Sequence, residues 1–103
     1  MKEKDLQKLI MDYLSAQKIF HFRNNTGAVE RTYNGRSCFM RYGCPGSPDI
    51  ICVVDGQFVG IEVKGDKGKQ SPEQKIFEAS LIYNGGKYIL ARSLEDVQSG
   101  LAN

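Results

Sequence analysis

Apolar positions near the start of the chain follow a helical period. One face carries Leu6, Leu9, Ile10, Tyr13 and Leu14 at the i, i+3, i+4, i+7 and i+8 positions. This spacing predicts an amphipathic helix. We expect its apolar stripe to cover a sheet, because such a stripe is stable only when another element buries it.

The next pattern is that of short strands. Residues 19–23 alternate loosely between apolar and polar, and residues 24–27 end this strand with turn-forming types. Residues 29–32 and 37–40 flank an Asn34-Gly35 pair, which is a strong signal for the turn of a β-hairpin.

A second pair of strands follows a rigid loop. Residues 43–48 hold too many glycines and prolines for a helix or a strand, so we expect a loop that leads into a strand over 49–54. Asp55-Gly56 then turns the chain back into a strand over 58–64. The basic, glycine-containing residues 65–70 form the next loop.

A well-marked helix comes next. Ser71 is placed as its N-cap, Pro72 occupies the first helical position, and Gln74 completes a capping box. The helix is predicted to end near Asn84, because two glycines, Gly85 and Gly86, follow it.

The remaining segments complete an α/β pattern. They are a strand over 87–91 and a terminal helix that Ser93 caps and that runs through Leu101. The order helix, strands, helix, strand, helix predicts a small mixed central β-sheet flanked by helices. At 103 residues, we expect a single domain over residues 1–103.

The amino-acid composition excludes several classes of protein. With 41% hydrophobic and 25% charged residues, disordered and coiled-coil sequences are excluded. No apolar run approaches the roughly 18 residues of a membrane span, and the first five residues are too charged for a signal peptide. We therefore expect a cytoplasmic protein without membrane contact. Cys38, Cys44 and Cys52 lack C-x-x-C spacing, which favours reduced thiols over disulfides or a zinc site.

The net charge of +2 conceals two basic regions. Between residues 18 and 41 the basic side chains are opposed by Glu30 alone, and a second group of lysines between residues 64 and 69 is opposed by Asp66. A solvated surface would explain both regions, and so would contact with a polyanion.

Three residues in the middle of the chain are candidates for chemistry: Asp49, Glu62 and Lys64. If Asp55-Gly56 is a two-residue turn, Asp49 lies opposite Glu62, with Cβ atoms roughly 5 Å apart. Two carboxylates so close repel unless a cation separates them or one is protonated. Together with a backbone carbonyl and waters, they suit Mg²⁺ or Mn²⁺. A three-residue turn would instead place Glu62 opposite Ile50.

A hard cation beside basic loops points to a phosphate substrate. The metal would polarise a phosphoryl oxygen and activate a bound water, and Lys64 would stabilise charge in the transition state. The expected reaction is phosphodiester hydrolysis. The structural alternative is an exposed Glu62/Lys64 pair beside an Asp49 that only begins a strand.

The ordered motifs resemble a known family. Gly46-Ser47-Pro48-Asp49, eleven residues, and Ile61-Glu62-Val63-Lys64 are similar to the motif of the PD-(D/E)XK nuclease superfamily. Within it the chain looks like the VRR-NUC (virus-type replication-repair nuclease) group, in its stand-alone, phage-type form. The supporting segments span nearly the whole chain: residues 23–27, 41–50, 61–64, 71–74 and 93–97.

The resemblance implies a restriction-endonuclease-like core and a set of site residues. It implies Asp49, Glu62 and the Val63 carbonyl as metal ligands, Lys64 and Gln74 as catalytic residues, and Glu3 as a ligand or water-holder. Gln74 in a capping box and an acidic residue in a first helical turn also have purely structural explanations, which stay open.

Further basic residues are expected to contact DNA, the expected substrate. Candidate phosphate contacts are Arg23, Arg31, Arg36, Arg41, Lys67 and Lys69, with Tyr33, Phe39 and Tyr42 interleaved among them for stacking or packing. The resemblance implies a homodimeric endodeoxyribonuclease that cuts branched DNA such as four-way (Holliday) junctions, in the host cytoplasm if phage-encoded. The alternatives are a non-catalytic nucleic-acid-binding module, and a nickase or single-strand nuclease that works with a replication partner.

Overall fold

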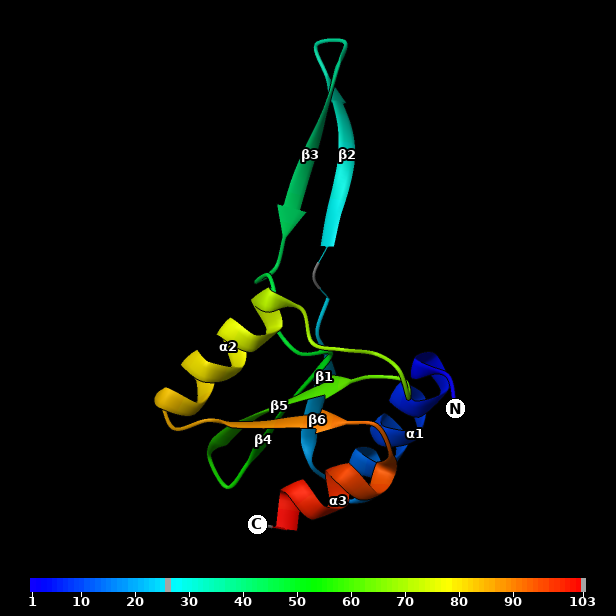
Figure 1. Cartoon of the computed structure of the whole chain (residues 1–103), viewed down its shortest axis with the longest axis vertical. Helices are drawn as coiled ribbons and strands as arrows, with labels where there is room; N and C mark the ends of the chain where they lie inside the picture. Colours follow the sequence, from blue (N-terminus) through cyan, green and yellow to red (C-terminus); the bar gives the residue numbers. More distant parts are fainter. Residues whose placement is uncertain (26, 103) are drawn as a thin grey trace.

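The computed structural model of the chain describes residues 1–25 and 27–102, and of ten residues between 27 and 42 only the backbone. Three helices and six strands follow one another along the chain (Figure 1). They are α1 (Glu3–Ala16), β1 (Phe20–Arg23), β2 (Gly27–Tyr33), β3 (Arg36–Tyr42), β4 (Ile50–Val54), β5 (Gln57–Val63), α2 (Pro72–Tyr83), β6 (Lys87–Ala91) and α3 (Leu94–Ala102).

Four of the strands form a central mixed sheet in the order β1-β4-β5-β6. The pairs β1/β4 and β4/β5 are antiparallel, whereas β5 and β6 run parallel because α2 carries the chain from one to the other. A mixed α/β fold with a small central sheet and flanking helices is therefore confirmed. β2 and β3 form a separate two-stranded ribbon that stands out from this body (Figure 1).

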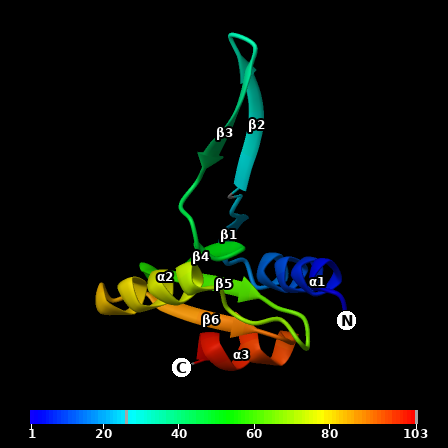
Figure 2. The same ribbon diagram turned by 45° about the horizontal axis from the view of Figure 1, so that its top comes forward.

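The hydrophobic core lies on one face of the sheet. Leu6, Ile10 and Leu14 of α1 are buried there, as the helical stripe predicted, together with Ile61 and Val63 of β5. The prediction was wrong for Leu9, which lies at the edge of the stripe and is exposed. Val97 of α3 joins the same cluster. α2 and α3 lie on opposite sides of the sheet (Figure 2), so α2 covers the face that is turned away from this core.

Both predicted two-residue turns are present. Asp55 and Gly56 have φ of 50° and 79°, and Asn34 and Gly35 have φ of 51° and 76°, the left-handed values that such hairpin turns require. The ribbon strands are longer than predicted, since backbone pairing continues from Tyr33↔Arg36 down to Gly27↔Tyr42. The alternation of side chains predicts strands that are too short here, because backbone pairing continues in the register that the turn sets.

Two of the three cysteines have described thiols, and both are free. Cys44 is exposed, whereas Cys52 is buried in the sheet, and burial raises the pKa of its thiol to about 11. A thiol that resists ionisation is a packing residue rather than a nucleophile. The reduced state of the cysteines stays a prediction.

Within residues 1–25 and 27–102, every helix is too short or too polar to cross a lipid bilayer.

Candidate functional site

Two carboxylates meet at the end of the sheet where β4 begins and β5 ends. Ile50 pairs with Ile61, so Asp49, directly before β4, lies opposite Glu62. The Val63 N–H donates a 2.8 Å hydrogen bond to Asp49 Oδ2, which fixes that side chain across the strand pair. The register predicted from the two-residue turn is confirmed, and the alternative pairing of Glu62 with Ile50 is excluded.

Glu62 is buried in an environment that disfavours its charged form. Its side chain is only 3% exposed, and Oε1 has no hydrogen-bond partner among the described residues. Burial raises the pKa of Glu62 to about 8; a hydrogen bond with Asp49 and the charges of Asp49 and Glu3 act in the same direction, and Lys64 opposes them. Without a cation at this position, Glu62 holds a proton at neutral pH.

Lys64 and Glu3 complete this group of charges. The Lys64 side chain is 15% exposed, and its Nζ lies 3.9 Å from Glu62 Oε2. Glu3 reaches the same place from the first turn of α1, where its Oε1 accepts a 3.1 Å hydrogen bond from the Gly65 N–H. Four ionisable residues, separated by up to 61 positions in sequence, therefore gather at one end of the sheet.

The loop before Asp49 is held by Asn24. Its Nδ2 donates to Ser47 Oγ at 2.7 Å and to the Pro48 carbonyl at 3.0 Å, and its backbone N–H donates to the Asp49 carbonyl at 2.7 Å. Asn24 directly follows β1, so the edge strand of the sheet positions the loop that carries Asp49. The local sequence pattern predicted a turn at Asn24, and residues 23–27 are one of the segments that carry the family resemblance.

Pro48 is buried against Gly60, and this contact requires a glycine. A Cβ at residue 60 would lie 2.6 Å from Pro48 Cγ. We predict that Gly60→Ala displaces Pro48 and with it Asp49, lowering the free energy of unfolding by about 1–3 kcal/mol and weakening divalent-cation binding. Urea denaturation and Mn²⁺ titration measure the two effects. Wild-type stability together with wild-type Mn²⁺ affinity would contradict the prediction.

Gln74 is engaged in a capping box. Its Oε1 accepts a 2.8 Å hydrogen bond from the Ser71 N–H, and its own N–H donates to Ser71 Oγ at 3.2 Å. The structural prediction for this residue is confirmed. Its catalytic role stays a prediction, since the cap already uses the side-chain oxygen.

Tyr88 lies near the carboxylates, and the sequence pattern did not predict it as a site residue. Gln70 Nε2 donates to both Tyr88 Oη at 3.2 Å and Glu78 Oε1 at 3.0 Å. Burial raises the pKa of Tyr88 to about 12, and the charges of Glu62, Glu78 and Asp49 contribute to the rise. No local pattern marks Tyr88, because only the parallel placement of β6 beside β5 brings it to this face.

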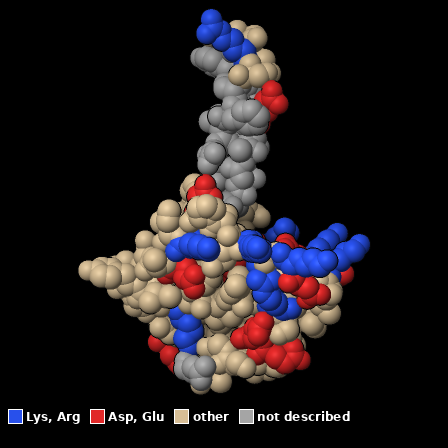
Figure 3. Space-filling view, in the orientation of Figure 1, with Lys and Arg blue, Asp and Glu red and all other residues tan. Residues whose placement is uncertain are grey.

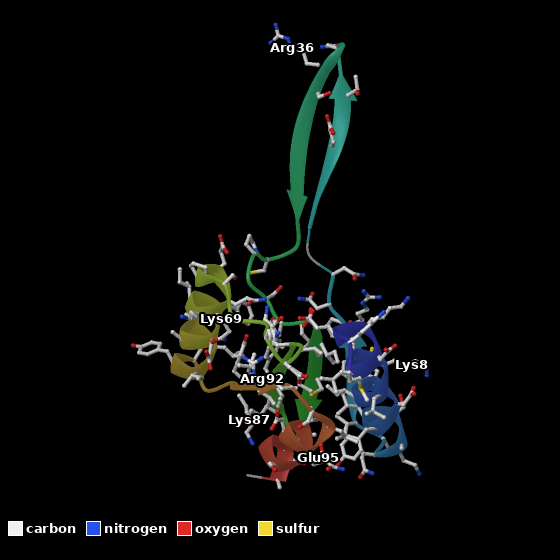
Figure 4. The ribbon with its side chains drawn as sticks, turned by 45° about the vertical axis from the view of Figure 1, so that its right-hand side comes forward. Lys8, Arg36, Lys69, Lys87, Arg92 and Glu95 are labelled. Carbon is white, nitrogen blue, oxygen red and sulfur yellow. The ribbon has the colours of Figure 1, made fainter. Side chains whose placement is uncertain are left out.

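The predicted basic residues occupy three separate places. Arg23 lines a groove of about 610 Å³ beside α1, together with Glu3, Lys4 and Lys8, and Lys and Arg side chains gather on this part of the surface (Figure 3). Lys67 and Lys69 are exposed in the loop before α2. Arg36 lies at the tip of the ribbon, far from Lys8 and Lys69 (Figure 4). The side chains of Arg31, Arg41, Tyr33, Phe39 and Tyr42 lie outside the described part of the structure.

The carboxylate pair fits a hard divalent cation. The described residues contain no group of three or more His, Cys, Asp or Glu side chains arranged to hold a metal. Mg²⁺, however, typically takes one or two protein carboxylates and keeps several waters. The buried, unpartnered Oε1 of Glu62 beside Asp49 is the kind of oxygen that such an ion would satisfy. Val63, whose carbonyl is the third predicted ligand, adjoins both.

Comparisons of the chain with protein-family models, with curated proteins and with solved structures found no match.

Proposed function

We propose that this chain is an Mg²⁺- or Mn²⁺-dependent endodeoxyribonuclease that hydrolyses phosphodiester bonds. One observation carries the proposal: the buried Glu62, with an unpartnered Oε1, lies opposite Asp49 and next to Lys64. A protein gains nothing in stability by burying a carboxylate against another one. Such an arrangement is typical of sites that bind a cation for chemistry.

The site residues have two proposed roles, which are binding of the ion and stabilisation of charge in the transition state. Asp49, Glu62 and the Val63 carbonyl would hold the ion, which when bound polarises a phosphoryl oxygen and lowers the pKa of a water. Lys64 Nζ, 3.9 Å from Glu62 Oε2, would face the negative charge that develops on the phosphate oxygens. Glu3, fixed by the Gly65 N–H, would orient a water at the edge of the site.

We propose that the chain is a member of the VRR-NUC group of PD-(D/E)XK nucleases, with branched DNA, such as a four-way junction, as its substrate. The motifs of the sequence support this, because the two acidic residues and the lysine that the group is expected to use lie together. The mixed sheet with helices on both faces agrees with the expected core.

Cleavage of defined DNA structures tests the proposed function. Wild-type protein and Asp49→Asn would be incubated with labelled duplex, single-stranded, flap and four-way-junction DNA, with Mg²⁺, Mn²⁺ or EDTA. We expect wild-type cleavage of branched DNA only with metal, and none by Asp49→Asn. Binding of all four substrates without cleavage would replace this proposal by the non-catalytic module. Cleavage of single strands alone would favour the nickase or single-strand nuclease.

We also propose a homodimer, supported by apolar residues on the outer surface of α2. Ile76 and Tyr83, seven residues apart and therefore on the same face of α2, are 67% and 89% exposed. Ile76→Asp is expected to shift the protein from dimer to monomer at micromolar concentration, because burying an unpaired charge is costly. Analytical ultracentrifugation measures this. The control, Gln98→Asp, adds the same charge on α3, and a monomeric wild type would contradict the prediction.

A further inference from the structure

β2 and β3 form a two-stranded ribbon that is separate from the four-stranded sheet. Each strand has seven residues, paired without interruption from Gly27↔Tyr42 to Tyr33↔Arg36. At roughly 3.4 Å per residue the ribbon is about 24 Å long. It accounts for much of the 52 Å long dimension of the molecule, and both views show it standing clear of the sheet (Figures 1 and 2).

Both ends of the ribbon return to the candidate active site. Asn24, three residues before β2, is hydrogen-bonded to the Pro48 and Asp49 carbonyls. After β3, the chain passes through residues 43–48 directly to Asp49. Both connections of the ribbon therefore belong to, or are hydrogen-bonded to, the loop that carries Asp49.

The tip of the ribbon is polar and cationic. Arg36 points outward at the far end (Figure 4), and Thr32, Asn34 and Ser37 are exposed beside it. Residues 27–42 contain three arginines and one glutamate, a net charge of 3 − 1 = +2, which equals the net charge of the whole chain. A projecting ribbon with this net charge and a polar tip is suited to contact with a polyanion.

We propose that the β2–β3 ribbon lies in a groove of duplex DNA beside the cleavage point and fixes where the protein sits on its substrate. The major groove, about 12 Å wide, admits a two-stranded ribbon. Because base pairs stack at about 3.4 Å, a 24 Å ribbon that lies along the duplex spans about seven base pairs between its base and Arg36 at its tip. This inference rests on the proposed function, which it deepens by naming a contact with the duplex arm of the substrate.

A shortened ribbon tests the proposal. Deleting residues 30–33 and 36–39 joins Val29 to Asn34 and Gly35 to Met40. Val29 and Met40 are paired in the native ribbon and lie four pairs from Tyr33↔Arg36. The alternation of hydrogen-bonded and non-hydrogen-bonded pairs therefore keeps its phase at the Asn34-Gly35 turn. The sheet and core are unchanged, and we expect the thermal midpoint to stay within a few degrees of that of the wild type.

DNA binding is measured in EDTA, where no cleavage occurs. For a four-way junction, we expect the shortened variant to bind at least tenfold more weakly and to lose footprint protection over about seven base pairs on one side of the cleavage site. The deletion removes Arg31 and Arg36, so the slope of log affinity against log salt concentration should fall by about 2. Arg36→Gln should lower it by about 1. Lys18→Gln, which removes one charge at the opposite end of the sheet, is the control.

The outcomes separate this proposal from the proposed function. A wild type that cleaves, together with a shortened variant of unchanged affinity, salt slope and footprint, would overturn the role of the ribbon alone. Ribbon-dependent protection without cleavage by the wild type would keep the ribbon as a DNA contact and overturn the nuclease. A shortened variant that becomes monomeric but keeps every DNA contact would assign the ribbon to a second copy of the chain and overturn the proposal.

Discussion

Replacing Glu62 with glutamine is expected to stabilise the metal-free protein at high pH. From its ordinary 4.5, the pKa of Glu62 rises to about 8 in the folded state. At about 1.4 kcal/mol per pKa unit, the gain in the free energy of unfolding at pH 9 should be on the order of 5 kcal/mol. At pH 5 the variant and the wild type should differ little.

The sign follows from proton linkage. Between pH 4.5 and 8 the folded protein binds the Glu62 proton more tightly than the unfolded chain does, so wild-type stability falls as pH rises through this window and is flat above it. Glutamine has no proton to lose and can donate to Asp49, as the protonated acid does. Urea denaturation in EDTA at pH 5, 7 and 9 measures the difference, with the exposed Glu95→Gln as control. A variant less stable than the wild type at pH 9 would contradict the prediction.

Metal binding should depend on pH for the same reason. A divalent cation competes with the proton on Glu62, so wild-type affinity for Mn²⁺ should rise up to tenfold per pH unit towards pH 8 and then level off. Glu62→Gln should lose this affinity, because a neutral amide is a weaker ligand. Calorimetry in two buffers of different ionisation enthalpy would detect the released proton.

Replacing Lys64 with methionine is expected to lower kcat for branched DNA by about 10²–10³-fold, the typical loss when one group that stabilises transition-state charge is removed. DNA affinity should change by less than tenfold, because a single ammonium beside the site adds little to a contact shared among many basic residues. Methionine keeps the length and the apolar stem of the half-buried side chain, so packing against the site is retained.

Single-turnover cleavage and anisotropy measurements separate the two effects of Lys64→Met. Lys67→Met removes the same charge from an exposed position in the adjoining loop, and we expect its kcat to stay within threefold of wild type. A Lys64→Met protein that cleaves as fast as Lys67→Met would show that Lys64 contributes only general charge. Restoration of part of the activity in Lys64→Arg would support the electrostatic role.

Local patterns were enough to predict most of the elements. The stripe of Leu6, Ile10 and Leu14 predicted the buried face of α1, and the Ser71 and Gln74 pattern predicted the start of α2, because caps and amphipathic periods act over a few residues. Asp55-Gly56 also predicted the register of β4 and β5, because a two-residue turn fixes which residues of the two strands pair.

Contacts between distant segments could not be predicted in this way. Tyr88 joins the site only because β6 lies parallel to β5, and Asn24 holds the Asp49 loop only because β1 pairs with β4. Both depend on strand order, which the sequence pattern leaves open. The size of the pKa shift of Glu62 likewise depends on burial, and burial is a property of the packed molecule.

The sequence by itself determined which side chains share a face of each strand and where the chain turns. It therefore also determined that Asp49 lies opposite Glu62, because these features are consequences of local backbone geometry. Only the tertiary structure decided that Glu3 reaches Gly65, that Pro48 is buried on Gly60 and that the β2–β3 ribbon projects from the body. These features arise from packing between elements far apart in the chain, where shape and solvent exclusion, rather than periodicity, select the contacts.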